Sequence, residues 1–413
     1  MSKYIKSSSI SVENSLFMKS GIIILCFYIA AAFPGTRLFG SLPVQRVSLL
    51  LLLAHGVIGI LCAIKTDIHT TTHMLWYGFF TLISFISLIM SGGELNNNDF
   101  HAVIICFVLT VIHSIYVVNK SSFKYICWSY IIVCLLNTII LIANNELVMG
   151  AGERLGDRLD VNPNVLATFF MYGIIYAIWL YYIEEKKKKK IIILILGLTI
   201  MYPLILTGGR KFFLAPILYF TIVLFMNNSH IKYMWIRNII VICALFCIMW
   251  YLIMTIPALY NSLGNRFEGL LNSITGKGNT EISAEVRRIL RKLAIEGWLN
   301  SPIWGNGFDT FKYYSADNGQ SLFYSHCNFT ELLYSGGIVY FMSYYWLFGM
   351  LLWKCFKDKT ISIKRRSLCF AGVIMQLFFD YGGVSYNTYH SQLFMLMIFC
   401  YLYDYKNTSL VMC

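Results

Sequence analysis

The residues whose types are best suited to catalysis or binding lie mainly in the one long polar segment of the chain, residues 257–330. Within it, residues 283–298 (S-A-E-V-R-R-I-L-R-K-L-A-I-E-G-W) predict a helix whose cations occupy the arc opposite its apolar side. His326, Asn328 and Glu331 follow at the start of the next apolar run. Cations and a titratable histidine beside a membrane predict a site for an anionic, lipid-borne substrate, because guanidinium groups match phosphate oxygens in pairs. The cations of the predicted helix are Arg287, Arg288, Arg291 and Lys292.

From the helix alone, two interpretations stay open. The helix could lie on anionic lipid headgroups, or its arginines could bind a diphosphate. Further polar groups stand at the ends of other apolar runs and favour the second interpretation. Arg210 lies in the turn T-G-G-R-K-F-F, and a second group precedes the run that begins near residue 163. We therefore expect these groups to converge on one polar cavity. The second group consists of Arg154, Arg158, Asn162 and Asn164.

The elements that must position these residues are membrane helices. Of the 413 residues, 58% are hydrophobic and only 13% are charged, which excludes an ordinary soluble globule. Twelve apolar runs are candidate spans of the ~30 Å hydrocarbon layer, of which those near residues 212 and 367 are short. The fold class is therefore predicted as all-α and polytopic, with short amphipathic helices in one long outer loop. The runs cover residues 17–34, 47–64, 74–91, 101–118, 125–143, 163–183, 191–207, 212–226, 238–256, 331–353, 367–380 and 390–404.

The distribution of lysine and arginine predicts the orientation. If the N-terminus is cytoplasmic and each run reverses the chain, 19 cations fall on the inner side and 6 in the short outer segments. Both termini are then cytoplasmic. Three regions follow: an N-terminal bundle of about nine helices (residues 1–256), the outer loop (257–330) and about three C-terminal helices (331–413). The lysine-rich run at 186–190 is interpreted as a topology anchor on anionic lipid, and we expect no nucleic-acid partner.

Taken in order, these motifs resemble the O-antigen polymerase and ligase superfamily of bacterial surface-polysaccharide assembly. The resemblance rests on N-P-N-V-L-A from Asn162, on T-G-G-R-K from Thr207, and on a longer pattern that begins at Arg287. That pattern continues through Pro302 and G-N-G-F to H-C-N-F-T-E-L-L, which starts at His326, and then to G-G-I. This chain departs from the family pattern at two positions. In the family, asparagine usually follows the histidine directly, whereas here one cysteine separates His326 from the asparagine. The residue before Arg210 is glycine, where the family often has serine.

The resemblance implies a glycosyltransferase of the bacterial cytoplasmic membrane. Such an enzyme transfers a glycan from undecaprenyl diphosphate to another lipid-linked repeat unit at the outer face, with inversion, and without a metal ion or other cofactor. Arg287 and Arg210 would stabilise the departing diphosphate, and His326 would act as the base, with Glu331 as the competing candidate. Arg158 matches a family cation, although Arg154 competes for that position. The residues expected to bind substrate are Arg154, Arg158, Asn164, Arg288, Arg291 and Asn328.

Other functions remain open at this point. A ligase that transfers glycan to lipid A–core would need the same donor site, and the sequence does not separate O-antigen from capsule assembly. A flippase or other exporter of lipid-linked oligosaccharide is less favoured, because the apolar runs contain few ionisable residues. The expected partners are the lipid-linked oligosaccharide, the bilayer and a chain-length regulator protein.

Overall fold

The computed structural model describes residues 16–33, 42–63, 72–94, 96–116, 120–150, 152–228, 233–274 and 282–403. Within these ranges the regular elements are all helical, as the sequence predicted. The long helices are α1 (Leu16–Ala31), α2 (Leu42–Ala63), α3 (Thr72–Met90), α4 (Asn98–Tyr116), α5 (Lys120–Ala143), α7 (Pro163–Ile183), α8 (Lys187–Leu206), α9 (Arg210–Asn228), α10 (Met234–Thr255), α13 (Ile282–Asn300), α15 (Asn328–Lys357), α16 (Ile363–Tyr381) and α17 (Tyr389–Tyr403). The short ones are α6 (Leu155–Arg158), α11 (Pro257–Leu259), a π-helical turn (Tyr260–Gly264), α12 (Asn265–Ile274) and α14 (Phe311–Asp317).

Each of the twelve predicted apolar runs overlaps one of the long helices. The remaining long helix, α13, corresponds to no apolar run. Among the described residues, seven helices are long and apolar enough to cross a membrane, and three more are apolar but shorter. The chain is therefore an all-helical membrane protein. The seven are α3, α5 from residue 123, α7, α8, α9, α10 and α15. Both chain ends lie outside the described ranges. So do six of the cations on which the predicted orientation rests: Lys3, Lys6, Arg37, Lys65, Lys232 and Lys406.

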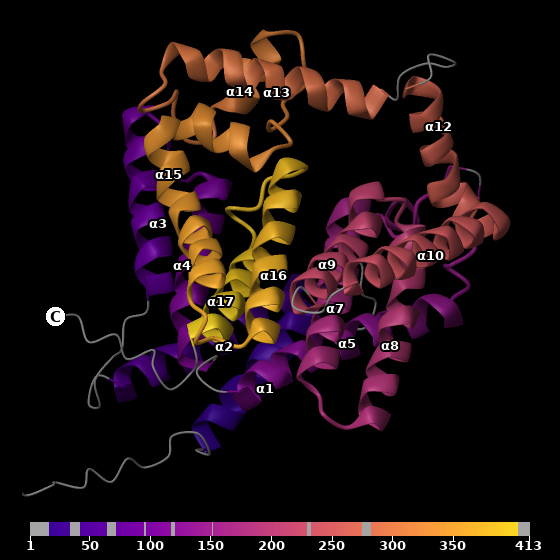
Figure 1. Cartoon of the computed structure of the whole chain (residues 1–413). Helices are drawn as coiled ribbons and strands as arrows, with labels where there is room; N and C mark the ends of the chain where they lie inside the picture. The colour runs from indigo at the N-terminus through magenta and orange to yellow at the C-terminus, as the bar shows by residue number, and fades with distance from the viewer. Residues whose placement is uncertain are drawn as a thin grey trace, which may run out of the picture.

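Helix α7 is the central element of the bundle. It packs against α5, α8 and α9, and 72% of its most apolar 18-residue window is buried. The corresponding figure for α10 is 11%, and α10 carries exposed Ile, Leu and Trp side chains along its length. An apolar surface of this kind is stable when lipid covers it. A second group of helices, α3, α15, α16 and α17, packs beside α7 and α9, mainly through the contact between α9 and α16 (Figure 1).

The polar segment 257–330 folds over one end of this bundle. Its longest helix, α13, lies crosswise above the ends of α3 and α15 and extends toward α12 (Figure 1). The apolar side predicted for this helix packs downward, because Leu290 and Ala294 are buried against Phe311 and Tyr334. The opposite arc of α13, which carries the cations, therefore faces away from Phe311 and Tyr334.

A break in α15 joins this segment to the bundle. The helix has non-helical backbone at Gly336 and Gly337, where φ is −141° and +64°. Residues 302–307 lie against the break and replace the missing helical hydrogen bonds. The N–H groups of Asn306 and Gly307 donate to the carbonyls of residues 334 and 335 at 2.8 and 2.9 Å, and the N–H of Ile338 donates to the carbonyl of residue 302 at 2.9 Å. We call residues 302–307 together with 334–339 the clasp.

Candidate functional site

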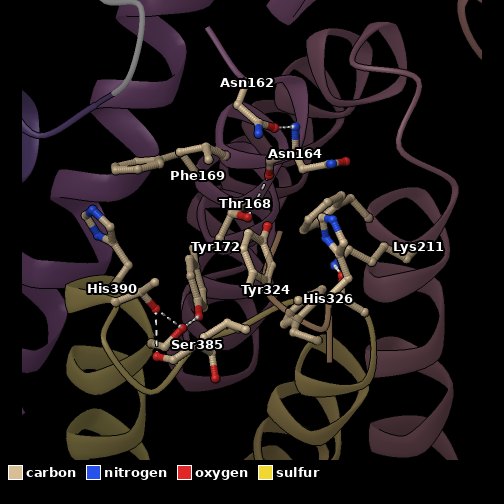
Figure 2. Close-up of a pocket in the computed structure, with 18 of the residues that line it drawn as sticks. Asn162, Asn164, Thr168, Phe169, Tyr172, Lys211, Tyr324, His326, Ser385 and His390 are labelled. Atoms are coloured by element: carbon tan, nitrogen blue, oxygen red, sulfur yellow. Dashed lines mark hydrogen bonds between the residues drawn. The ribbon is translucent and has the colours of Figure 1, made fainter. Parts of the chain in front are cut away.

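A cavity of about 190 Å³ lies at the end of the bundle that α13 covers. It is bordered by the N-terminal ends of α7, α9 and α17, by the C-terminal end of α16, by α13 and by the turn before α15 (Figure 2). In the predicted topology all of these helix ends lie on the same side of the membrane. The charged and titratable side chains of its lining include Lys211, Arg287 and His326. The amide and hydroxyl groups come from Asn162, Asn164, Thr168, Tyr172, Tyr324, Ser385, Thr388 and Ser391.

Helix α9 brings Lys211 to the cavity and directs Arg210 elsewhere. The turn T-G-G before the helix places the two residues one position apart on the helix, so their side chains diverge. Arg210 donates to the carbonyl oxygen of Arg266 at 3.0 Å, while Arg266 donates to the carbonyl of Gly208 at 2.9 Å. The predicted catalytic residue Arg210 thus links the start of α9 to α12 and does not line the cavity. Lys211, to which the sequence analysis assigned no role, does line it.

Of the cations on α13, only Arg287 lines the cavity. Arg291, one turn further along, lies with its guanidinium carbon 4.9 Å from the centroid of the Tyr381 ring. Arg288 is exposed and forms an ion pair with Glu285 at 2.5 Å. Of the cations of this helix that were expected to bind substrate or stabilise its diphosphate, Arg287 alone lines the cavity, and Arg291 lies close enough to act on His326 through its charge.

His326 stands in a sharp turn that directs its ring into the cavity. Its backbone is left-handed, with φ of +55°, a conformation in which histidine is more frequent than most residues. The Tyr324 ring lies 4.3 Å from the His326 ring, centroid to centroid (Figure 2). Burial, followed by the positive charges of Arg287, Lys211 and Arg291, lowers the pKa of His326 from 6.5 to about 4. At neutral pH the imidazole is therefore uncharged and able to accept a proton.

Glu331 lies behind this turn and not in the cavity. Its carboxylate is buried and accepts a hydrogen bond from the backbone N–H of Ser325 at 2.7 Å. The Ser325 hydroxyl in turn donates to the carbonyl of Cys327 at 2.9 Å, and Thr330 donates to the Ser325 hydroxyl at 3.0 Å. Glu331 therefore helps to hold the loop that carries His326, and among the two candidate bases His326 is the one that faces the cavity.

Asn328 is likewise a structural link between two segments. Its side-chain oxygen accepts the backbone N–H groups of Ser385 and Tyr386 at 3.0 and 3.1 Å, and its amide nitrogen donates to the Tyr345 hydroxyl at 2.8 Å. The backbone N–H of Asn328 donates to the carbonyl of Gly383 at 3.0 Å. Asn328 is fully buried and does not line the cavity. It fixes the turn between α16 and α17 against the start of α15.

The N-terminus of α7 supplies the amide side of the cavity. Asn162 caps the helix by accepting the N–H of Asn164 at 2.9 Å. Arg154 joins this cap to the turn before α9, because its guanidinium donates to the Asn164 side-chain oxygen at 3.3 Å and to the Thr207 carbonyl at 2.8 Å. Arg158 instead bonds the carbonyl of residue 148 and lies 3.9 Å from Glu153. Between the two alternatives, Arg154 is the cation linked to a lining residue.

The turn between α16 and α17 forms the remaining wall, and the sequence analysis assigned it no role. Gly382, Gly383, Ser385, Thr388 and His390 all line the cavity. The sequence signal was present as two glycines followed by an uncharged polar run, V-S-Y-N-T-Y-H-S, between two apolar helices. Polar residues that carry no charge gave no reason to choose this turn over an ordinary connection.

The cavity therefore combines two cations, the imidazole rings of His326 and His390, and a wall of amides and hydroxyls. This set can bind an anion on one side, accept a proton beside it, and hydrogen-bond a polyhydroxylated group on the other side. Its volume is smaller than the ~300–1,000 Å³ of sites that enclose drug-sized ligands, so it encloses only a small polar group. No known protein-family model matches this sequence, and no curated protein sequence matches it.

Proposed function

We propose that this chain is a membrane glycosyltransferase that joins lipid-linked oligosaccharides. The observation that carries the proposal is the placement of Lys211, Arg287 and a neutral His326 around one cavity at a single end of a membrane bundle. A prenyl diphosphate presents its charged headgroup at this depth, while its chain stays in lipid. The sugar attached to the diphosphate is already activated, so the site needs no nucleotide donor.

In the proposed reaction, a hydroxyl oxygen of the acceptor sugar attacks the anomeric carbon of the donor. The bond from that carbon to the diphosphate oxygen breaks, and its electron pair remains on the diphosphate. The hydroxyl proton passes to the imidazole of His326. Arg287 stabilises the negative charge that the leaving diphosphate gains. Attack from the face opposite the leaving group inverts the anomeric carbon.

The proposed topology has twelve spans and places the cavity on the outer face. If successive spans cross the membrane in opposite directions, three groups of cations lie on the side opposite the cavity. They are the lysines at the start of α8, Lys354 and Lys357 at the end of α15, and the basic residues at the start of α16. The positive-inside rule makes that opposite side cytoplasmic. The acceptor is proposed to be a second lipid-linked repeat unit, which makes the enzyme a polysaccharide polymerase.

The test uses the full-length protein in lipid nanodiscs with undecaprenyl-diphosphate-linked oligosaccharide as both donor and acceptor. Chain growth on a gel is expected for the wild type, and His326→Ala should slow it by about 10²–10⁴-fold. His101, an exposed histidine at the start of α4, provides a matched control, and His101→Ala should retain full activity.

A reaction that proceeds only after lipid A–core is added would identify a ligase instead. Wild-type protein that transfers glycan to neither acceptor, or His326→Ala protein that transfers as fast as the wild type, would overturn the proposed mechanism. Movement of intact lipid-linked units across a liposome membrane without chain growth would support an exporter.

A further inference from the structure

The ammonium group of Lys211 lies in a small recess of the cavity wall. Its ammonium nitrogen donates to the carbonyl oxygen of Gly382 at 2.6 Å and lies 4.7 Å from the centroid of the Phe212 ring. A methyl group added to Gly382 would lie 3.0 Å from that nitrogen, and one added to Gly383 would lie 3.4 Å from it. The two glycines therefore leave the space that the ammonium fills.

The ammonium is charged but incompletely hydrogen-bonded within the described part of the protein. It carries three N–H donors, and the Gly382 carbonyl accepts one of them. The buried acid whose charge acts on Lys211, Asp380, has its own carboxylate occupied: Ser385 and Gln376 donate to one oxygen at 2.5 and 2.9 Å, and Tyr345 donates to the other at 2.8 Å. No carboxylate in the described ranges lies within ion-pair distance of Lys211.

Three features of this placement are unfavourable in the empty cavity. Lys211 lies in the first turn of α9, where the positive end of the helix dipole opposes a cation. Arg287, a second cation, lines the same cavity, and its charge acts on Lys211. Lys211 is also only partly exposed to solvent, which weakens the screening between like charges. A bound anion would offset all three costs at once, and an uncharged ligand would offset none.

We propose that Lys211 is a catalytic residue whose ammonium binds a non-bridging oxygen of the donor diphosphate beside Arg287. This inference rests on the proposed transfer reaction. As the bond between the anomeric carbon and the diphosphate oxygen breaks, the electron pair moves onto the diphosphate, and the two remaining N–H groups of Lys211 donate to its oxygens. The proton of the acceptor hydroxyl goes to His326. Arg210, the residue before Lys211 in the chain, plays no direct part because it does not line the cavity and its guanidinium donates to the Arg266 carbonyl.

Two variants separate the charge of Lys211 from its position. Lys211→Met removes the ammonium and keeps the length of the side chain. Gly382→Ala keeps the charge but crowds the ammonium, which must shift by a few tenths of an ångström, and its backbone, with φ of −117°, accommodates alanine without strain. The matched control is Lys292→Met, since Lys292 lies on the exposed face of α13 and pairs with Glu296 at 3.6 Å.

The experiment measures binding of farnesyl diphosphate and inorganic pyrophosphate to the full-length protein in nanodiscs, alongside glycan transfer. Lys211→Met is expected to weaken binding of both probes by about 10–100-fold and to lower kcat by about 10²–10³-fold. Gly382→Ala should give a smaller loss of the same kind, and Lys292→Met none. Without ligand, the melting temperature of Lys211→Met should stay within about 3 °C of the wild type, because the substitution also removes an uncompensated cation.

Unchanged probe affinity and unchanged kcat in Lys211→Met would overturn the inference, whatever the acceptor used. If the wild type binds the probes through Lys211 but transfers no glycan to any acceptor, the proposed function fails and the diphosphate site stands. If the wild type transfers glycan and Lys211→Met does so equally well, the function stands and the role of Lys211 falls.

Discussion

The titration of His326 gives the sharpest test of the site. A histidine with an ordinary pKa of 6.5 would be only about 3% uncharged at pH 5, whereas one with a pKa of about 4 would be about 90% uncharged. If the uncharged imidazole is the base, kcat/KM should remain nearly constant between pH 7 and pH 5. An ordinary histidine would instead lose about 25-fold over the same range. The sign follows from the cause, since burial and neighbouring cations both disfavour the imidazolium.

The assay is the pH profile of kcat/KM for glycan transfer, because this ratio reports ionisations of the free enzyme. A direct measurement of the His326 pKa comes from nuclear magnetic resonance of histidine-labelled protein, in which His326→Gln identifies one signal among eight histidines. A decline of ten-fold or more between pH 7 and pH 5 that tracks the His326 signal would refute the electrostatic reasoning.

A matched pair of variants on α13 tests the cause of the shift. Arg291→Gln removes one of the charges that lower the His326 pKa without removing a lining residue, so the acid limb should move to higher pH. Arg288→Gln removes a charge that is paired with Glu285 on the exposed side of the same helix, and the profile should not move. Equal shifts in the two variants would show that net charge, and not the local arrangement, sets the titration.

Two further predictions concern stability, each measured as thermal unfolding in detergent. Gly337→Ala should destabilise the protein by at least about 3 kcal/mol, because its backbone conformation is nearly exclusive to glycine and the new methyl would lie 2.2 Å from the Ile303 carbonyl oxygen. The control is Gly349→Ala in the same helix, which has open space around it and should cost nothing. Asn328→Ala should cost about 2–4 kcal/mol, because the buried N–H of Ser385 and hydroxyl of Tyr345 each lose a partner; an unchanged melting temperature would contradict the bridging role.

The positions of the long apolar helices were predictable because hydrophobicity alone determines them. Every apolar run read from the sequence coincides with a helix, including the short one near residue 367, which the structure extends to Ile363–Tyr381. The apolar side of α13 was predictable for the same reason, since a period of 3.6 residues places Leu290 and Ala294 together. The break at Gly336 was not, because an apolar run with two glycines also fits a continuous span.

The site was predictable only as far as residue type and membrane side determine it. Arg287, His326 and Asn164 do line one cavity, but the residue of α9 that lines it with them is Lys211 and not the predicted Arg210. Adjacent residues at the start of a helix point in directions about 100° apart, so the choice between them depends on how α9 is rotated against α16. That rotation is set by tertiary packing, and no local pattern encodes it.

The clasp also bears on how the protein folds. Within the membrane an unpaired carbonyl is costly, and the carbonyls of residues 334 and 335 are satisfied by N–H groups that arrive from residues 306 and 307. Helix α15 therefore cannot complete its hydrogen bonding during insertion until the chain before it has reached the bundle. Cutting or shortening the 302–307 stretch should unfold the neighbouring transmembrane helix along with it, so the two parts gain their stability in one cooperative step.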